Sequence, residues 1–469
     1  MDGALSLPVL TELLLRGSPS GGRGRPIRVR GLLTIDPDED DRERRRECKD
    51  LVALDLTGCV SAVFVSALTE FVNTHLLDQD GYSSGSDDEG QRQNRLPHAT
   101  RFMQEEPLTF PGLQRLGLRG VKSIQSHILT PFVLAFPSLT HLDLSATRVT
   151  PELLTALGES SIRLRSLGLA RCIRLTGSSI RDFLVRAPAA ARLQELTLYG
   201  DQTFPSPITT DELNEIISLA PCFTSGELTY LDLSSVPVTK EILIDVCKPL
   251  PNLRSLGLSY IPDLQLDVIA QFLKTKAPNV EVLTLVSTSP DLDRGRAGAV
   301  IGVTRSSAQQ ASMALHSRII GPLCTPAYES TPLSQTIEMQ PPTRLRVIEL
   351  SAPTLTGLGA GAGTWRIIKS KGSRGWYVDT ARGWVGAELK RNLPKEHPLR
   401  VQMDRLADAN GNVNSGVGWH ARKMEVSNWL ITTTWNGRAN NIALKILHGC
   451  GMLGREDGLY GAVSFAYQG

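Results

Sequence analysis

The chain of 469 residues carries 50 Lys and Arg against 48 Asp and Glu, a formal net charge of +2, so no global field favours nucleic acid or an anionic membrane. Its seven cysteines, an odd number without a CxxC pair, argue against a disulfide framework and favour the cytoplasm or the nucleus. The first residues lack the cationic start of a signal peptide, and no apolar run reaches the roughly 18 residues of a membrane span, so neither secretion nor a membrane is expected.

The phrase Leu-x-x-Leu-x-Leu recurs along the chain. Strict copies begin at Leu51, Leu113, Leu139, Leu164, Leu193, Leu228 and Leu253, and looser copies at Leu10, Val280 and Leu345. Where nothing intervenes, copies begin 25 to 29 residues apart, which suits one short strand and one returning helix. Alternation along a strand directs the leucines at positions 4 and 6 inward and positions 3, 5 and 7 outward. The copy at Leu10 predicts a strand near the start of the chain, so we expect either an unusual N-terminal cap or a fragment of a longer product.

These copies resemble the leucine-rich repeat family over residues 1–358. The resemblance implies an α/β solenoid shaped as a horseshoe, with parallel strands on the concave face and helices on the convex face. Position 9 lacks the asparagine of extracellular repeats. The stretches LDLTGC (Leu54 to Cys59) and LGLARCIRLTGSSI (Leu167 to Ile180) are instead similar to the cysteine-containing repeats of ribonuclease-inhibitor-like and F-box proteins. No F-box is visible before the first copy.

Two sequences predict where connecting helices begin. Thr150-Pro151 offers a cap followed by proline at the first helical position, and Thr209-Thr-Asp-Glu212 has the spacing of a capping box. The thiols of Cys59 and Cys172 are expected to be buried as small apolar groups.

Three segments interrupt the array, at about 17–50, 78–107 and 287–343. Their composition predicts disordered loops, which are either simple solvated insertions or regulatory segments. The candidate phosphorylation sites are Ser84 and Ser86, which precede acidic residues, and Ser289, Thr325 and Thr331, which precede proline. We expect deletion of residues 289–341 to leave the thermal midpoint almost unchanged.

Residues 359–469 differ from the array, because they hold all six tryptophans and no leucine phrase. A cap over the last core layer, or an irregular extension, is expected, with a hairpin around Asp379 to Arg382. An aromatic ligand pocket is the alternative. The segment from Val426 to Ile446 fits its surroundings poorly and raises the alternative of a translated intron.

The search for catalytic motifs gives none. The glycines from Gly357 to Gly363 fail the G-x-G-x-x-G spacing, and His448-Gly-Cys450 is too small a set for a zinc site. No catalytic, cofactor or metal residue is therefore assigned, and the chain is not expected to be an enzyme.

Function is left to the outward positions of the central strands. The predicted partner-binding residues are Arg115, Arg119, His141, Glu195, Tyr199, Tyr230 and Asp232. The aspartates at position 5 either bind a partner or only stabilise the solenoid. The leading hypothesis is a protein-interaction module, for which the F-box-like repeats imply substrate recognition in an SCF-type ubiquitin ligase. The alternatives are a regulator resembling the leucine-rich GTPase-activating proteins and an enzyme housed in the tryptophan-rich region.

Overall fold

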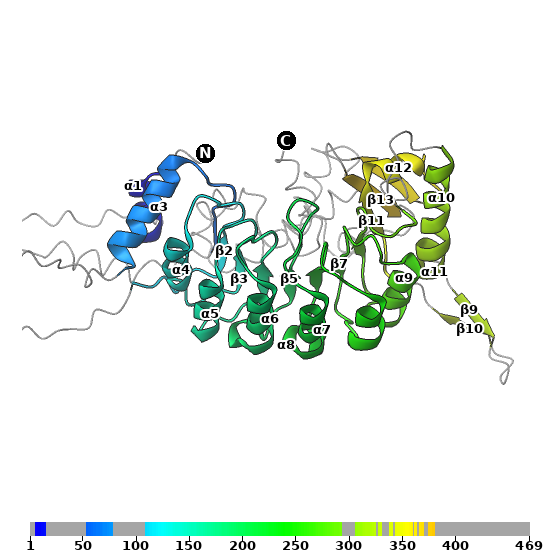
Figure 1. Ribbon diagram of the computed structural model, residues 1–469, viewed down its shortest axis with the longest axis horizontal. Helices are drawn as coiled ribbons and strands as arrows, with labels where there is room; N and C mark the ends of the chain where they lie inside the picture. The colour runs from blue at the N-terminus through cyan, green and yellow to red at the C-terminus, as the bar shows by residue number, and fades with distance from the viewer. Residues whose placement is uncertain are drawn as a thin grey trace, which may run out of the picture.

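The main feature is one sheet of 11 strands in the order β1-β2-β3-β4-β5-β6-β7-β8-β11-β13-β12 (Figure 1). The computed structural model describes residues 5–15, 53–77, 108–292, 305–324, 327–330, 337–340, 343–359, 361–363, 365–369 and 374–379. The strands of this sheet are β1 (Ala53–Asp55), β2 (Arg115–Gly117), β3 (His141–Asp143), β4 (Ser166–Gly168), β5 (Glu195–Thr197), β6 (Tyr230–Asp232), β7 (Ser255–Gly257), β8 (Val282–Thr284), β11 (Val347–Ser351), β12 (Trp365–Lys369) and β13 (Arg374–Asp379). Strands β1 to β8 pair in parallel with one another, and β11 pairs in parallel with β8, whereas β13 is antiparallel to both β11 and β12. The result is a mostly parallel open sheet, consistent with a leucine-rich-repeat-like solenoid.

The strands keep one register from repeat to repeat. Each of β1 to β8 covers positions 3 to 5 of one leucine phrase, and the position-4 residues stand opposite one another, as Leu116, Leu142 and Leu167 do. The leucines at positions 4 and 6 belong to one hydrophobic core, and Leu142 and Leu144 are both 0% exposed. The inward direction predicted for these positions is confirmed.

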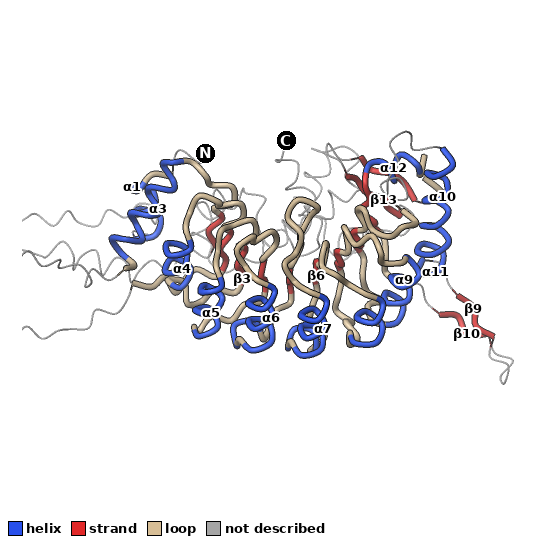
Figure 2. The backbone as a smooth tube through the Cα atoms, in the orientation of Figure 1, coloured by secondary structure: helices blue, strands red, loops and turns tan. Residues whose placement is uncertain are grey.

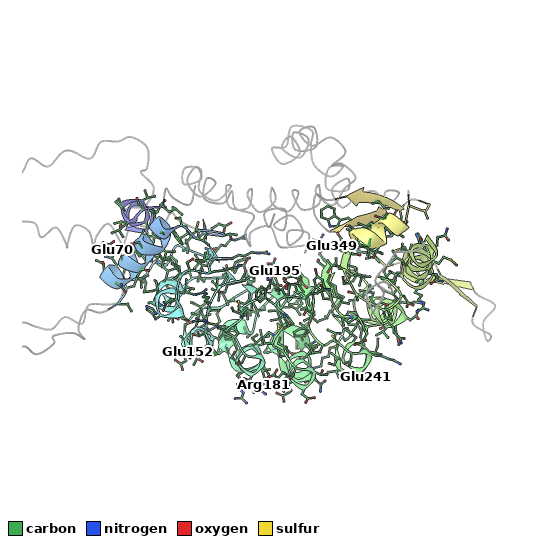
Figure 3. All side chains as sticks on the ribbon, turned by 45° about the horizontal axis from the view of Figure 1, so that its top comes forward. Glu70, Glu152, Arg181, Glu195, Glu241 and Glu349 are labelled. Carbon is green, nitrogen blue, oxygen red and sulfur yellow. The ribbon has the colours of Figure 1, made fainter. Side chains whose placement is uncertain are left out.

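Helices line one side of the sheet, and the strands form the other side (Figures 1 and 2). The α-helices are α1 (Leu7–Leu15), α3 (Ala62–His75), α4 (Ser126–Leu134), α5 (Pro151–Glu159), α6 (Gly177–Arg186), α7 (Thr210–Leu219), α8 (Pro221–Thr224), α9 (Leu266–Thr275), α10 (Arg305–Leu315), α11 (Gly321–Cys324) and α12 (Ala352–Gly357). Shorter turns are the 3-10 helix η2 (Pro188–Ala190) and the π-helical η3 (Ile242–Val246) and η4 (His316–Ile320). We call the two sides the strand face, where Figure 3 labels Glu195 and Glu349, and the helix face, where it labels Glu152 and Arg181.

The predicted helix starts are present, with one difference. Thr209 caps α7 in a capping box, in which Glu212 accepts the Thr209 N–H at 2.9 Å. Pro151 occupies the first turn of α5, but the Thr150 side chain makes no cap bond and instead donates to Ser126 Oγ at 2.8 Å. Cys172 is buried and its thiol donates to the Leu144 carbonyl at 3.1 Å, whereas Cys59 is only half-buried.

A left-handed residue follows almost every strand at position 8. The φ angle is +74° at Gly58 and +75° at Gly120, but non-glycine residues take the same conformation at Ala146, Arg171 and Ser235. Such a conformation costs about 1 kcal/mol for a residue with a Cβ. It is repeated because the N–H at this position donates to the next repeat, as from Ala146 to the Ala170 carbonyl at 2.7 Å. The turns therefore stack in register beyond the strand ends.

The prediction of a strand at Leu10 is wrong. Residues Leu7–Leu15 form helix α1, whose Leu10 and Leu14 are 0% and 2% exposed and which packs against α3. The leucines of this segment fit both the helical and the strand periodicity. Leu7, Leu10 and Leu14 share one face of a helix, whereas Leu13 and Leu15 alternate as in a strand.

The prediction of a disordered loop throughout 287–343 is also wrong. Residues 305–324 form α10, η4 and α11, and Leu315, Ile319 and Leu323 are 0% exposed in the common core. Strands β9 (Ala327–Ser330) and β10 (Ile337–Gln340) form a separate antiparallel pair. The sparse apolar residues of the segment are typical of a loop, yet Leu315, Ile319 and Leu323 recur at helical spacing and pack into the core at the end of the array. Residues 17–50 and 78–107 lie outside the described residues.

A hairpin of β12 and β13 extends the sheet past β11. Tyr377 is 0% exposed and accepts the Ala362 N–H at 3.0 Å, and its hydroxyl lies 2.9 Å from His316 Nε2. The Trp365 ring packs on Tyr377 at 5.3 Å between centroids. The strand expected at Trp376 is present as β13, and it pairs on one side with β11 and on the other with β12, which precedes it in the chain. Residues 380–469, with most of the expected hairpin turn at Asp379 to Arg382, lie outside the described residues. The predicted tryptophan-rich cap therefore stays a prediction.

Candidate functional site

A continuous row of position-3 side chains crosses the strand face. The paired residues run Arg115, His141, Ser166, Glu195, Tyr230 and Ser255, from β2 to β7. Since parallel strands lie about 4.8 Å apart, the row from Arg115 to Tyr230 spans about 20 Å. The structure thus brings four of the predicted partner-binding residues into one line.

The predicted residues point away from the leucines, but several of them are not exposed. Tyr199, Tyr230 and Glu195 are 7%, 5% and 8% exposed. The two tyrosines nevertheless lie outside the apolar core cluster, in agreement with their odd positions. Arg115, Arg119, His141 and Asp232 are half-buried. Alternation therefore predicted the direction of these side chains, and their burial depends on neighbours that alternation does not describe.

The position-5 aspartates have a local structural role. Oδ1 of Asp55, Asp143 and Asp232 accepts the backbone N–H two residues later, at 3.0 Å in each repeat. The following strand always carries glycine at the paired position, where a Cβ would overlap the aspartate: Gly117 beside Asp55, Gly168 beside Asp143 and Gly257 beside Asp232. Of the two interpretations of these aspartates, the structure supports local stabilisation of the turn. The other carboxylate oxygen of Asp232, which is half-buried, accepts a hydrogen bond from the Tyr230 hydroxyl at 3.4 Å.

His141 lies in a basic and desolvated part of the face. Burial, and then the positive charges of Arg115 and Arg165, lower the pKa of His141 to about 3. Its Nδ1 lies 2.8 Å from the Thr140 hydroxyl. The ring is therefore neutral at physiological pH, and it offers hydrogen bonds rather than charge to a partner.

A shallow recess lies over β4, β5 and β6. It is lined by Ser166, Gly168, Glu195, Thr197 and Tyr230, and its volume of about 190 Å³ includes the open solvent above it. The small side chains of Ser166 and Gly168 create this space, and Glu195 supplies a carboxylate at its wall.

The sequence reasoning missed the loop after β5. The repeat that begins at Leu193 is longer than its neighbours, since the next begins at Leu228, and the additional residues follow Gly200. The guanidinium carbon of Arg171 lies 5.2 Å from the Phe204 ring centroid, and Arg171 Nε lies 3.1 Å from Asp201 Oδ2. The unusual repeat length was the signal that could have identified this loop.

Burial argues against Ser289 as a phosphorylation site. The residue is 0% exposed, its N–H donates to the Ile261 carbonyl at 3.2 Å, and its φ angle is +69°. A kinase needs an accessible hydroxyl on an extended segment, so this prediction is corrected. Ser84, Ser86, Thr325 and Thr331 lie outside the described residues, and their phosphorylation stays a prediction.

Three cysteine thiols in the described part of the chain are buried. Burial raises the pKa of the Cys172, Cys222 and Cys247 thiols to about 12, so these thiols stay protonated and unreactive. Within the same residues, no group of three or more His, Cys, Asp or Glu side chains is placed to hold a metal ion. Among the described helices, none has the length and apolar character to cross a bilayer.

Comparisons with known proteins give partial structural likenesses. No protein-family model and no curated protein sequence matches the chain. One similar chain comes from a crystal structure of the Rad7 and Elc1 complex in yeast. Its sequence is 22% identical to this one, the match covers 42% of this chain and 56% of the other, and the TM-score is 0.26. The leucine-rich repeat-containing protein LegL7 from Legionella pneumophila is 15% identical over 43% of this chain and 71% of that chain, with a TM-score of 0.23. The chain spans little more than half of the Rad7–Elc1 chain that it matches. Because both TM-scores are low, the fold and the strand face rest on the geometry of this chain alone.

Proposed function

We propose that this protein is a protein-interaction module that binds a partner protein on its strand face. The row Arg115-His141-Ser166-Glu195-Tyr230 carries the proposal, because it places a cation, a neutral imidazole, a carboxylate and a phenol along one side of the sheet. Arginine and tyrosine are the residue types most enriched at interface hot spots. Arg119, Tyr199 and Asp232 flank the row and extend the proposed surface.

In the proposed geometry the strand face is the concave face of a horseshoe-shaped solenoid. The recess at Glu195 would receive a protruding side chain, and the neighbouring small residues Ser166 and Gly168 would allow its close approach. The neutral state of His141 favours a partner that supplies hydrogen-bond donors and acceptors at this point of the row.

Affinity purification followed by mass spectrometry tests the proposal. The wild-type chain is compared with Arg115→Ala and His141→Ala, which alter half-buried side chains of the strand face. Arg181→Ala on α6 is the matched control, because Arg181 lies on the helix face (Figure 3). We expect wild type and Arg181→Ala to retain a partner protein that the two strand-face variants lose. In a binding assay with purified proteins, each strand-face variant should bind that partner about tenfold more weakly than wild type. Equal retention by all four proteins would remove the strand face as the binding surface.

The two tyrosines of the proposed surface are better tested by a substitution that keeps the aromatic ring. Tyr199 and Tyr230 are almost fully buried, so their truncation to alanine would lower stability as well as affinity. Tyr230→Phe keeps the ring and removes only the hydroxyl, and its melting temperature shows whether a loss of affinity is specific.

We further propose that this module acts in substrate recognition for an SCF-type ubiquitin ligase. The support is the similarity of the cysteine-containing repeats around Cys59 and Cys172 to those of F-box proteins. Co-purification of a Skp-family adaptor with the chain would support this role. Accelerated GTP hydrolysis by a co-purified GTPase would favour a GTPase-activating regulator instead.

A further inference from the structure

A second surface follows the edge of the solenoid where the strands end. The loops after β2, β3 and β4, residues 118–125, 144–150 and 169–176, carry only positive charges: Arg119, Lys122, Arg148, Arg171 and Arg174. The loops after β5 and β7, residues 198–209 and 258–265, carry Asp201 and Asp263, and the described residues 285–292 after β8 carry Asp291. Asp201 is ion-paired with Arg171, and Asp291 is buried and ion-paired with Arg318, whereas Asp263 is exposed. The tan connections in Figure 2 include these loops. The exposed cations of this edge are therefore concentrated on the loops after β2, β3 and β4.

The loops form one surface because their turns stack in register. The N–H of Gly120 donates to the Ser145 carbonyl at 2.8 Å, and that of Arg171 donates to the Tyr199 carbonyl at 3.0 Å. The residues two places after position 8 are Lys122, Arg148 and Ile173 in three successive repeats. Lys122, Arg148 and Arg174 are all exposed, so the basic half of the edge faces solvent.

Two exposed apolar side chains lie on the loops after β4 and β5. Ile173 is 62% exposed and Phe204 is 38% exposed, although both belong to loops that adjoin well-packed strands. The guanidinium of Arg171 lies against the Phe204 ring, and Arg171 and Ile173 belong to the same loop. Arginine and aromatic side chains, such as Arg171 and Phe204, are enriched at surfaces where proteins bind one another.

The loop that presents Phe204 is held in one conformation. Asp201 Oδ1 accepts the N–H groups of Thr203 and Phe204, each at 2.8 Å, and the Asp201 N–H donates to the Phe204 carbonyl at 2.9 Å. The ion pair of Asp201 with Arg171 ties this loop to the preceding repeat, and both side chains are largely buried, at 18% and 13% exposed. Binding at Phe204 would therefore require little further ordering of the loop.

We propose that this edge, formed by Lys122, Arg148, Ile173, Arg174 and Phe204, binds an acidic segment of a partner protein that carries one large apolar side chain. The carboxylates of the segment lie over Lys122, Arg148 and Arg174, and its apolar side chain packs on Ile173 and Phe204. The exposed cations of the edge select an acidic partner. The aliphatic surface of Ile173 has no hydrogen-bonding group and favours an apolar side chain over a nucleobase. This surface is separate from the strand face and does not depend on it.

A synthetic peptide tests the proposal by fluorescence anisotropy with the full chain. The probe is a labelled peptide of about 15 residues, with glutamates in one half and a central leucine, titrated at low salt and at about 0.15 M salt. The comparison probes are the same peptide with lysine in place of glutamate and a single-stranded DNA of similar length. We expect the acidic peptide alone to bind, and its affinity to fall at the higher salt.

Matched variants locate the site. The combined change Lys122→Ala, Arg148→Ala and Arg174→Ala should weaken binding about tenfold or more. The control combines Arg186→Ala, Arg192→Ala and Lys274→Ala, which removes three exposed cations elsewhere and gives the same net charge, and it should change affinity by less than about twofold. Ile173→Ser and Phe204→Ser should each weaken binding, and Ile173→Ser leaves the hydrogen bonds of the Asp201 loop intact. Tighter binding of DNA, equal binding of the basic peptide, equal losses in the two triple variants or no binding up to about 1 mM would each overturn the proposal.

Discussion

At the scale of single residues, the aspartate at position 5 determines what the next repeat can carry. Asp143 Oδ1 accepts the Ser145 N–H at 3.0 Å, and the same carboxylate fills the space beside Gly168 on the following strand. Neither Asp143 nor Gly168 is one of the leucines that define the repeated phrase. The register of β3 and β4 nevertheless places them opposite each other, although they lie 25 residues apart in the sequence.

Gly168→Ala is expected to lower the free energy of unfolding by about 1–3 kcal/mol, because the added methyl overlaps Asp143. Asp143→Ala alone should cost about 1 kcal/mol through the lost turn bond. The double variant should be more stable than the sum of the two losses predicts, since the smaller side chain makes room for the methyl. Urea unfolding of the four proteins measures this coupling, with Ser166→Ala on the same strand as a control. Strict additivity would contradict the proposed overlap.

His141 should make stability depend on pH. Its pKa is about 3 in the folded protein, through burial and then Arg115 and Arg165, and about 6.5 when unfolded, so the unfolded chain binds the additional proton between these values. Stability is therefore lost as pH falls from about 6.5, by up to about 2 kcal/mol at pH 5. His141→Gln should reduce the difference in unfolding free energy between pH 7 and pH 5, whereas His127→Gln, exposed on α4, should not. An unchanged difference in His141→Gln would place the acid sensitivity elsewhere.

At the scale of elements, α10, η4 and α11 belong to the array. Leu315, Ile319 and Leu323 are fully buried, and Arg318 pairs with Asp291 at 2.6 Å. The expectation that residues 289–341 are dispensable is therefore replaced by its opposite: their deletion should lower the thermal midpoint strongly.

Ile319→Ala tests this element without a deletion. Truncation of a fully buried isoleucine should cost about 2–5 kcal/mol, from lost burial and the cavity that remains. Met313, which is 71% exposed on α10, is the matched control, and Met313→Ala should change stability by less than about 0.5 kcal/mol. Thermal melts of both variants give the comparison, and similar midpoints would mean that the helix does not contribute to the cooperative unit.

At the scale of the whole molecule, the solenoid is stabilised between neighbours. Each strand from β2 to β8 pairs only with the strands of the adjacent repeats, so a defect is transmitted mainly to those repeats. The proposed binding surfaces also depend on this order, because both are assembled from side chains of several repeats.

Leu142→Ala, in β3, should destabilise the protein by about 2–5 kcal/mol. Hydrogen exchange should accelerate first in β2, β3 and β4, and less in β8 and β11, since the distant repeats keep their own contacts. Leu219→Ala on α7, where the side chain is 59% exposed, should leave the exchange pattern unchanged. Uniform acceleration over all strands would indicate a single cooperative unit instead.

The sequence determined the repeat, the strands at positions 3 to 5, the inward direction of the leucines and the start of α7, because each depends on residues close together in the chain. Alternation also set the direction of Tyr199 and Tyr230. Only the tertiary structure decided that these rings are buried, that Leu10 lies in a helix against α3, and that Leu315 and Ile319 enter the core. It also decided that Arg171 meets Phe204 and that Asp143 excludes a side chain at Gly168. Local periodicity specifies the face that a side chain takes, whereas burial and contact depend on what the neighbouring repeats and distant segments place on that face.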